Sequence, residues 1–588
     1  MQAVHINCPN NRFTKTTPKR RKFVKGNVGR NPIFTYTPKI GLMKKIIYFL
    51  LLLTVSGLRS NLYSQTVILQ DSNIIQQQVF VNIDSLIIRN CLFENIIGEA
   101  VRFSNIDYVE ISDSRFTNIT NTISTRAVIC GKSSPKVLLK NLDFQYITGT
   151  AIRIPTDGAT ALSDRVGSVM IDSVNIYHCQ SIQSQIGDAI RIFHTDTLIV
   201  ANSTIRLIDN LGINIGRNSS TLQQSQKVRY CHIYSNVIDS VLSDGIGSQE
   251  NIDFALLEHN TISHIAYNGV GARPAHGDHG IYWQAPNAII KDNFISQNAD
   301  GLVSGHSGSG ISLRTNATIS NNIISHCTGN GIGYFNDHRA NGNTLITNNV
   351  IYDCNSIGIY HNGSNGNNLD PNSVRHPDTV FIFHNTVLNE PIQTPMHLSA
   401  PIGFNSMKSK NYLSGNILIF ETVIDTTKHI FITNTPHLVR QYNHLVSGDI
   451  AFEDYPNRIL QLTSSSSAVD LLPHGTTFVS HDILNNIRTE PHDAGAYEFI
   501  PMVTGLNPVP TNLHDIQLFP NPSKGQLYFK SLQRVNEINV FDYTGKLTKT
   551  IKVDTTQGEF QIEPTGNIFV IQIVFMDGTT AITRVYIE

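Results

Sequence analysis

Short runs of alternating apolar and polar residues recur through the middle of the chain, and most contain Asn, then any residue, then an aliphatic residue. Alternation with period two is typical of β-strands. The marker asparagines are Asn236, Asn260, Asn293, Asn322, Asn349, Asn385 and Asn416, at intervals of 24, 33, 29, 27, 36 and 31 residues. A repeat of this length indicates a solenoid in which each repeat supplies one coil.

A second marker, Gly followed by Ile, comes shortly before the next apolar run, at Gly245, Gly280, Gly310, Gly331 and Gly358. Looser copies of the apolar run lie upstream, around Phe93, Phe116, Phe144, Ile176 and Ile205. Helical periodicity is hard to find in this region. The pattern therefore predicts an all-β fold, a parallel β-helix of about 11–13 coils stacked about 4.8 Å apart.

The marker asparagines are expected to join one coil to the next. Asparagine tolerates left-handed backbone angles at a tight bend, and its amide can bond to the equivalent amide one coil away. We therefore interpret this row as scaffold.

Two cysteines, Cys327 and Cys354, each follow their marker asparagine by five residues, so they should share one position on adjacent coils. The coil spacing lies within the Cα range of a disulfide. Cys179 lies three residues after its own apolar marker, which favours a row of small inward side chains. We expect that row, with a disulfide as the alternative.

The net charge of −1 conceals an uneven distribution. Residues 1–64 hold 12 of the 44 Lys and Arg residues and none of the 45 Asp and Glu residues, so the remaining 32 basic and 45 acidic residues give a net charge of −13. This excludes a generally basic nucleic-acid-binding protein and favours neutral or cationic partners over anionic ones. After residue 64 no apolar run is long enough to cross a bilayer.

The amino terminus has the features of an export signal. Met43-Lys44-Lys45 is followed by a nearly all-apolar run, Ile46 to Val55, and then by small and polar residues. Residues 43–64 are therefore expected to be a signal peptide, and residues 1–42 an extension upstream of the true start codon. The protein is expected to be secreted, with attachment to the outer-membrane surface as an alternative.

From Ser85 to Phe499 the repeats resemble the right-handed parallel β-helix superfamily, the pectate-lyase-like fold, which gives a domain over residues 65–500. The resemblance does not imply one reaction, because the superfamily includes lyases, hydrolases, epimerases and adhesins. The stretches Ser464–Asp470 and Arg488–Phe499 resemble the closing turn of secreted bacterial β-helix proteins. Asp470 and Asp493 are interpreted as structural there.

A proline-spaced linker, residues 501–515, leads to a segment of short alternating strands, residues 516–588, that suits a small β-sandwich. Its opening Pro520-Asn521-Pro522 with Gly525, and the strand beginning Gly566-Asn567-Ile568, resemble the type A C-terminal sorting domain of the Bacteroidetes type IX secretion system. The resemblance implies that the type IX machinery is a partner of this domain.

Two adjacent coils are longer than the others between the marker asparagine and the next Gly-Ile. The distance is nine residues in three coils, but twenty from Asn260 to Gly280 and seventeen from Asn293 to Gly310. The additional loops, residues 270–279 and 302–309, should protrude side by side and wall a groove. If Ile281 and Ile311 point inward, Tyr282, Gln284, Ser312 and Arg314 point outward and Trp283 faces the core.

The candidate catalytic residues in and after these loops are Arg273, His276, Asp278, His279, Tyr282, His306 and Arg314. In a polyuronate lyase an arginine would neutralise the substrate carboxylate, a histidine would remove the proton and Tyr282 would act as acid. A hydrolase would need two carboxylates, for which Asp278 has Asp300 as partner. No cofactor is firmly implied; a divalent cation such as calcium at His276, Asp278 and His279 is a weaker alternative.

Polysaccharide cleavage by a lyase or glycoside hydrolase is thus the leading hypothesis, with a polysaccharide or other glycan as the partner. The rival is a non-catalytic adhesin or glycan-binding solenoid, in which the loop histidines and arginines are ordinary solvated residues.

Overall fold

The computed structural model describes the β-helix, a closing segment and the C-terminal domain. The described residues are 65–121, 127–155, 164–181, 187–216, 227–266, 278–298, 308–335, 342–363, 379–390, 399–405, 409–423, 425–433, 435–475, 479–501, 517–519, 523, 525–541, 547–563, 568–576 and 580–586. The expected extension and signal peptide therefore lie outside the described residues, as does the linker apart from Pro501.

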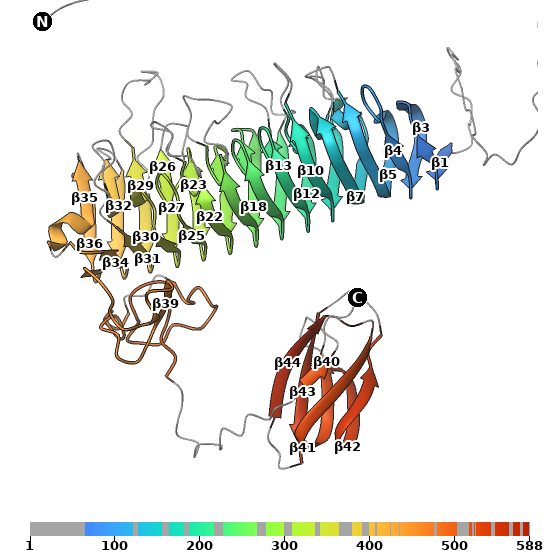
Figure 1. Ribbon diagram of the computed structural model, residues 1–588. Coiled ribbons are helices and arrows are strands. Elements are labelled where there is room, and N and C mark those ends of the chain that lie inside the picture. The colour runs from blue at the N-terminus through green and yellow to red at the C-terminus, as the bar shows by residue number, and fades with distance from the viewer. Residues whose placement is uncertain are drawn as a thin grey trace, which may run out of the picture. The chain divides into compact units, whose positions relative to one another are not determined.

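The chain winds through three columns of parallel strands, A, B and C, and visits them in that order in every coil (Figure 1). Column A contains β1 (Thr66–Gln70), β3 (Gln78–Arg89), β5 (Val101–Thr120), β7 (Lys136–Thr148), β9 (Val166–Asp172), β12 (Thr195–Ala201), β15 (Val228–Tyr234), β18 (Ile252–Glu258), β21 (Ala288–Lys291), β24 (Ala317–Ser320), β27 (Thr344–Thr347), β30 (Thr379–Phe383), β33 (Lys410–Ser414) and β36 (Leu438–Gln441).

Column B follows directly, and the long strands β5 and β7 bend to continue into it. Its other members are β2 (Asn73–Ile74), β4 (Leu92–Glu94), β10 (Asn175–Gln180), β13 (Thr204–Ile208), β16 (Val237–Val241), β19 (Thr261–Ile265), β22 (Phe294–Asn298), β25 (Ile323–Ser325), β28 (Val350–Tyr352), β31 (Thr386–Asn389), β34 (Ile417–Phe420) and β37 (His444–Val446).

Column C begins with the first residues of β3 and β5. It continues through β6 (Ala127–Lys132), β8 (Thr150–Ile154), β11 (Ile190–Ile192), β14 (Ile213–Ile215), β17 (Ile246–Ser248), β20 (Ile281–Trp283), β23 (Ile311–Leu313), β26 (Ile332–Phe335), β29 (Ile357–Asn362), β32 (Ala400–Asn405) and β35 (Ile430–Thr433). A short 3₁₀ helix, η4 (Thr426–His429), precedes β35. Columns A and B each hold fourteen described strand positions, slightly more than the predicted coil number, because the end coils lie beyond the run of markers.

One continuous row of apolar side chains fills the column B side of the core. The upstream copies predicted from sequence belong to it, because Phe93 pairs with Phe116 and Phe116 with Phe144 in register. Their rings stack with centroids 4.7 and 4.8 Å apart. The row continues through Ile176 and Ile205 into the marked coils. The parallel β-helix predicted from the pattern is confirmed.

The asparagine ladder forms as expected, from Asn236 to Asn416 and on to Asn443. The prediction that the marker asparagines themselves have left-handed backbone angles was wrong. The left-handed residue is the one before each asparagine, such as Ser235 at φ 55°, His259 at φ 56° and Asp292 at φ 55°. The bend is therefore made one position earlier, and this leaves the asparagine side chain buried between coils.

The marker glycines lie where two coils approach closely. A Cβ on Gly331 would come within 2.6 Å of the Gly358 carbonyl oxygen and 2.4 Å of Ile351. Only glycine fits such an approach without a shift of the backbone. Cys327 and Cys354 are buried and are not joined in a disulfide, so the inward row is present and the alternative disulfide is not formed.

The closing segment follows the last coil and contains the antiparallel pair β38 (Phe452–Asp454) and β39 (Ile459–Leu462). Its apolar residues form a second core with residues on the outer face of column B, including Leu388 and Ile419. Asp493 has the structural role expected from sequence, since its carboxylate accepts the backbone N–H of Asp470 at 2.7 Å and that of Phe499.

The C-terminal domain is an antiparallel sheet of five strands. They are β40 (Gln517–Phe519), β41 (Gln526–Phe541), β42 (Leu547–Gln561), β43 (Ile568–Phe575) and β44 (Thr580–Tyr586). A separate hydrophobic core includes Leu527, Phe529, Ile538, Ile571 and Phe575. The predicted β domain at the end of the chain is present as one antiparallel sheet, and the two-layer packing of the predicted β-sandwich stays a prediction.

Candidate functional site

The two long coils are neighbours, as the groove hypothesis requires. Asn260 Nδ2 donates to Asn293 Oδ1 at 3.0 Å, and Ile281 pairs with Ile311 in column C. The greater part of both loops lies outside the described residues, including Arg273, His276, Asp300 and His306. The described part of the predicted site consists of Asp278, His279, Tyr282 and Arg314, together with the strands that carry them.

The outer face of column C carries the residues expected there. Ile281, Trp283 and Ile311 are fully buried in the core, while Tyr282 and Arg314 are partly exposed. Ser312 occupies the outward position in register with Tyr282 but is buried, so it is not open to solvent.

Arg314 lies over two aromatic rings on the outer face of column C. Its guanidinium carbon is 5.4 Å from the centre of the Tyr282 ring and 4.7 Å from that of Phe335. Tyr282, Arg314 and Phe335 belong to three successive coils, so a cation lies between two rings along the coil axis. Cation–π contacts of this kind hold the guanidinium against the ring faces.

His279 lies behind this group. It is buried, its ring stacks on Tyr282 with centroids 5.4 Å apart, and its Nδ1 accepts the Ser309 backbone N–H at 3.0 Å. Burial lowers the pKa of His279 to about 3, and the positive charge of Arg314 acts in the same direction. The imidazole is therefore neutral, with its proton on Nε2, and its one lone pair is already used. This arrangement suits a structural histidine better than a general base.

A repeated corner position explains why His279 is buried. It is equivalent to Asp188, Asp244 and Asn330 in other coils, each just before column C begins. All four side chains accept a backbone N–H from the following coil, at distances of 3.3 Å for Asp188, 2.9 Å for Asp244, 3.0 Å for His279 and 3.2 Å for Asn330. His279 therefore fills a place in a second ladder at the corner between columns B and C.

Asp278 is also buried, with 2% of its surface exposed. Its Oδ1 accepts a hydrogen bond from Ser243 Oγ at 3.1 Å. Its predicted partner for hydrolysis, Asp300, lies outside the described residues, so the carboxylate pair stays a prediction.

Two aromatic residues of the same face were not singled out from sequence. Phe335 and Tyr360 are partly exposed, with ring centroids 6.0 Å apart, and they extend the row beyond Arg314. Both follow a Gly-Ile marker by two to four residues, at Gly331 and Gly358. The position of these two aromatic residues after a Gly-Ile marker could therefore have identified them from the sequence.

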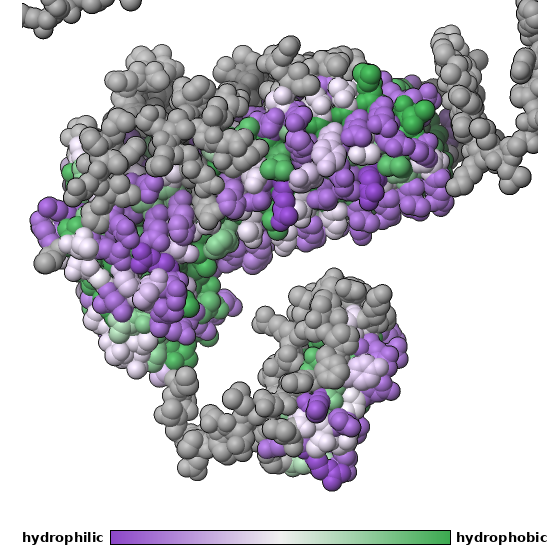
Figure 2. Space-filling model, viewed as in Figure 1, coloured by the Kyte–Doolittle hydropathy of each residue, from purple (hydrophilic) through white to green (hydrophobic). Residues whose placement is uncertain are grey.

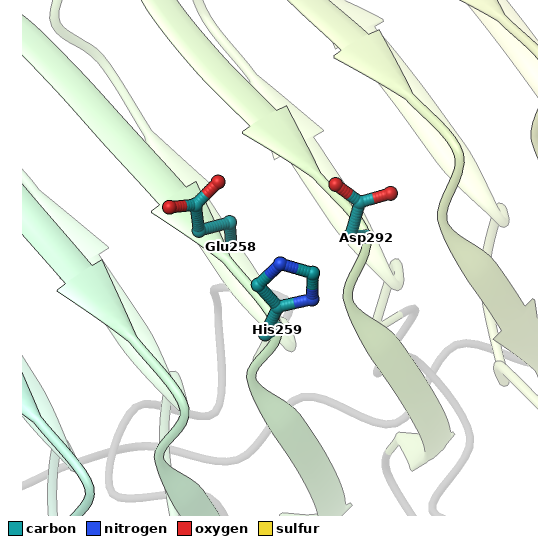
Figure 3. A group of neighbouring side chains, drawn as sticks. All are labelled: Glu258, His259 and Asp292. Atoms are coloured by element: carbon teal, nitrogen blue, oxygen red, sulfur yellow. The ribbon is translucent and has the colours of Figure 1, made fainter. Parts of the chain in front are cut away.

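One group of three metal-ligating side chains occurs among the described residues, Glu258, His259 and Asp292 (Figure 3). It lies at the corner between columns A and B, where the asparagine ladder runs, and not on column C. The ammonium of Lys291 is 2.9 Å from Glu258 and 3.3 Å from Asp292, and His232 is 2.9 Å from Glu258. Since the Lys291 ammonium already pairs with both carboxylates, we assign no metal to the group, and the calcium hypothesis stays a prediction.

Comparison with known families supports both domains. Residues 212–387 match the family described as the right-handed beta helix region, and residues 517–568 match the secretion system C-terminal sorting domain. No curated protein matches the sequence. The chain thus contains a right-handed parallel β-helix and a sorting domain. That domain implies export through the type IX machinery, so the protein is secreted.

Among solved structures, a mutant of the periplasmic alginate epimerase AlgG is similar with 12% sequence identity and a TM-score of 0.29. The match covers 55% of this chain and 76% of the epimerase. Within the described parts of the chain, no helix has the length and apolar character needed to span a membrane.

Proposed function

We propose that this secreted protein binds an extended polysaccharide along the outer face of column C and cleaves it as a lyase or glycoside hydrolase. The observation that carries the proposal is the position of Arg314 over the rings of Tyr282 and Phe335. Aromatic rings stack on the apolar faces of sugars, and a guanidinium edge pairs with carboxylates. Successive coils about 4.8 Å apart would present these groups along a linear polymer.

The chemistry of cleavage would come from the loops beside this face. Arg314 would hold and neutralise a sugar carboxylate, and the predicted groups Arg273, His276 and His306 would supply further charge and proton transfer. His279 would position Tyr282, because its ring stacks on the Tyr282 ring. It would not act as a base, because its Nδ1 lone pair already accepts the Ser309 backbone N–H. Tyr282 is partly exposed, and its hydroxyl accepts a hydrogen bond from Gln284 Nε2 at 2.7 Å.

A non-catalytic glycan-binding protein is the second candidate. It is favoured by the burial of Asp278 and His279, which makes both residues part of the corner scaffold. Binding would then use Arg314 and the aromatic row without any reaction.

The two functions are separated by measuring binding and cleavage on one panel of acidic and neutral polysaccharides. Binding is followed by affinity electrophoresis, and cleavage by reducing ends and the ultraviolet absorbance of unsaturated products. Arg314→Ala and Tyr282→Ala should each weaken binding about tenfold, a loss of about 1.4 kcal/mol. Arg229→Ala and Tyr146→Ala are the matched controls, since both residues are exposed away from column C.

Cleavage that disappears in His276→Ala with binding retained would support the enzyme. Binding without cleavage across the panel would support the adhesin. If Arg314→Ala and Tyr282→Ala bind the polysaccharides as tightly as the two control variants do, the outer face of column C is not the binding face.

A further inference from the structure

The N-terminal end of the β-helix is an open sheet edge. Among the described residues, β1 pairs only with β3, β2 only with β4, and residues 78–81 of β3 only with β5. All three columns therefore begin with a strand that has one unpaired edge (Figure 1). Unpaired strand edges are templates for pairing with another chain.

The hydrophobic core is open at the same end. Four inward residues of the first coil are only partly buried, whereas their register partners one coil further are fully buried. The pairs are Val67 with Leu86, Leu69 with Ile88, Phe80 with Phe103 and Ile83 with Ile106. A solenoid end of this kind normally carries a polar cap.

The outward residues of the first coil are apolar as well. Ile68, Ile75, Val79 and Val81 are exposed by 61%, 70%, 55% and 47%. Hydrophobic residues are visible on the surface near this end in Figure 2. Residues 65–84 contain two charged residues, Asp71 and Asp84, and no Lys, Arg or Glu. Edges that stay exposed are usually protected by charge, and this one is not.

At the opposite end, the chain covers part of its own last coil. The closing segment packs against Val446 of column B there, and His444 Nε2 lies 2.8 Å from Ser467 Oγ of that segment, although β35, β36 and β37 also pair on one side only among the described residues. A contact between two N-terminal ends uses the same surface on both copies, which gives a closed pair instead of a filament.

We propose that the N-terminal end of the β-helix is the interface of a two-fold symmetric dimer. Three edges arranged around one core can be paired together only by a surface of the same outline, and the N-terminal end of a second copy has that outline. A two-fold axis perpendicular to the coil axis pairs one column with its own copy and the other two columns with each other, all antiparallel. If the predicted signal peptide is removed before Gln65, the mature chain starts at the first coil. The proposal does not depend on polysaccharide binding.

The test uses the secreted protein with its N-terminus at Gln65. Light scattering after size-exclusion chromatography, over a range of concentrations, should give twice the monomer mass. Ile68→Lys combined with Val81→Lys should give a monomer with unchanged melting temperature, because both side chains are already exposed in the single chain. Leu484→Lys is the matched control, since Leu484 is 56% exposed in the closing segment.

Hydrogen exchange of residues 66–81 gives an independent readout without any substitution. Exchange should slow as protein concentration rises, while exchange in the C-terminal coils stays constant. A monomer at all concentrations would overturn the proposal. A dimer that persists in the double variant, or whose protection maps elsewhere, would also overturn it.

Discussion

Asn260 and Asn293 are 33 residues apart in sequence and joined by a hydrogen bond of 3.0 Å between their side-chain amides. Asn293 Oδ1 also accepts the backbone N–H of Asn260 at 3.0 Å, and Asn293 Nδ2 donates to the carbonyl of Leu257 at 3.0 Å. One side chain thus satisfies two buried backbone groups of the preceding coil. The two coils that carry the long loops are therefore neighbours, which the candidate site requires.

Asn293→Leu should therefore destabilise the β-helix strongly. The substitution leaves the buried Asn260 amide and the Leu257 carbonyl without partners, at about 1–3 kcal/mol for each group. A urea titration should show a clear fall in the midpoint. Ser235→Gly is the control, because Ser235 is exposed, has a left-handed backbone and donates nothing to the ladder. Equal stability of the two variants would contradict the scaffold role of the ladder.

Gly331→Ala should be destabilising for a different reason. The new methyl group would lie 2.6 Å from the Gly358 oxygen and 2.4 Å from Ile351, so two coils must move apart, at a cost of about 1–3 kcal/mol. Gly448→Ala is the matched control, because no atom lies within 4 Å of its added Cβ. Thermal unfolding of the two variants checks the prediction. A Gly331→Ala protein as stable as the control would show that the coils yield easily.

The markers predicted the fold well because both are imposed by contacts between coils. An asparagine at the ladder position hydrogen-bonds to the neighbouring coil, and a glycine at the marker position leaves room for two backbones to approach. Both residue types therefore recur at regular positions in the sequence. The upstream coils were harder to read because Ser203, Val174, Leu142 and Ser114 occupy the ladder position there. In those coils, only the row of buried apolar residues on the column B side marks the repeat in the sequence.

The candidate site was predicted only in part. Alternation placed Trp283 in the core and Tyr282 and Arg314 outside, as the structure has them. Nothing in the local sequence showed that His279 is buried, because the reason is a bond to Ser309 in the next coil. The residue before the Gly-Ile marker is Asp244 or Asn330 in two other coils but Ser309 or Ile357 in two more, so the pattern only partly indicates this corner position.

The protein should lose stability in acid through His361. This side chain is buried in the core, stacks on Tyr334 at 4.9 Å and bonds through Nδ1 to Asn411 Oδ1 at 2.7 Å. Burial lowers the pKa of His361 to about 4 in the folded protein, below its ordinary value of 6.5. The unfolded chain therefore binds more protons below pH 6.5, and stability falls as the pH drops towards 4, by about 3 kcal/mol in total.

Urea midpoints at pH 7 and pH 4.5 measure this loss. His361→Gln keeps a donor for Asn411 and removes the titrating group, so the difference between the two midpoints should shrink. His474→Gln should leave the difference unchanged, because the His474 side chain is 72% exposed. An unchanged difference in His361→Gln would assign the acid sensitivity to other groups, such as His279.

The cysteines should behave as buried thiols. Cys327 and Cys354 are 0% and 1% exposed, and each Sγ lies 3.7 Å from a backbone carbonyl two residues earlier. The folded protein should not react with a thiol reagent, and a reductant should not change its melting temperature. After denaturation all six cysteines from Cys91 to Cys354 should react. Fewer than six reactive thiols in the non-reduced protein would reveal a disulfide.

The closing segment should depend on one buried arginine. Arg488 is fully enclosed, with Nη1 3.2 Å from Glu498 and Nη2 2.9 Å from Asn348 Oδ1 in the β-helix. Arg488→Met would leave the Glu498 carboxylate buried without its counter-charge, which costs about 3–5 kcal/mol. Hydrogen exchange should accelerate throughout residues 466–499 before the coils unfold.

The double variant Arg488→Met, Glu498→Gln removes both charges and should regain part of that stability. Arg458→Met is the comparison within the same segment. Arg458 bonds to Asp353 and Glu421 but is partly exposed, so water replaces some of the lost interaction and the change should be smaller. If Arg488→Met exchanges no faster than Arg458→Met, the segment is held by its apolar core and not by the buried ion pair.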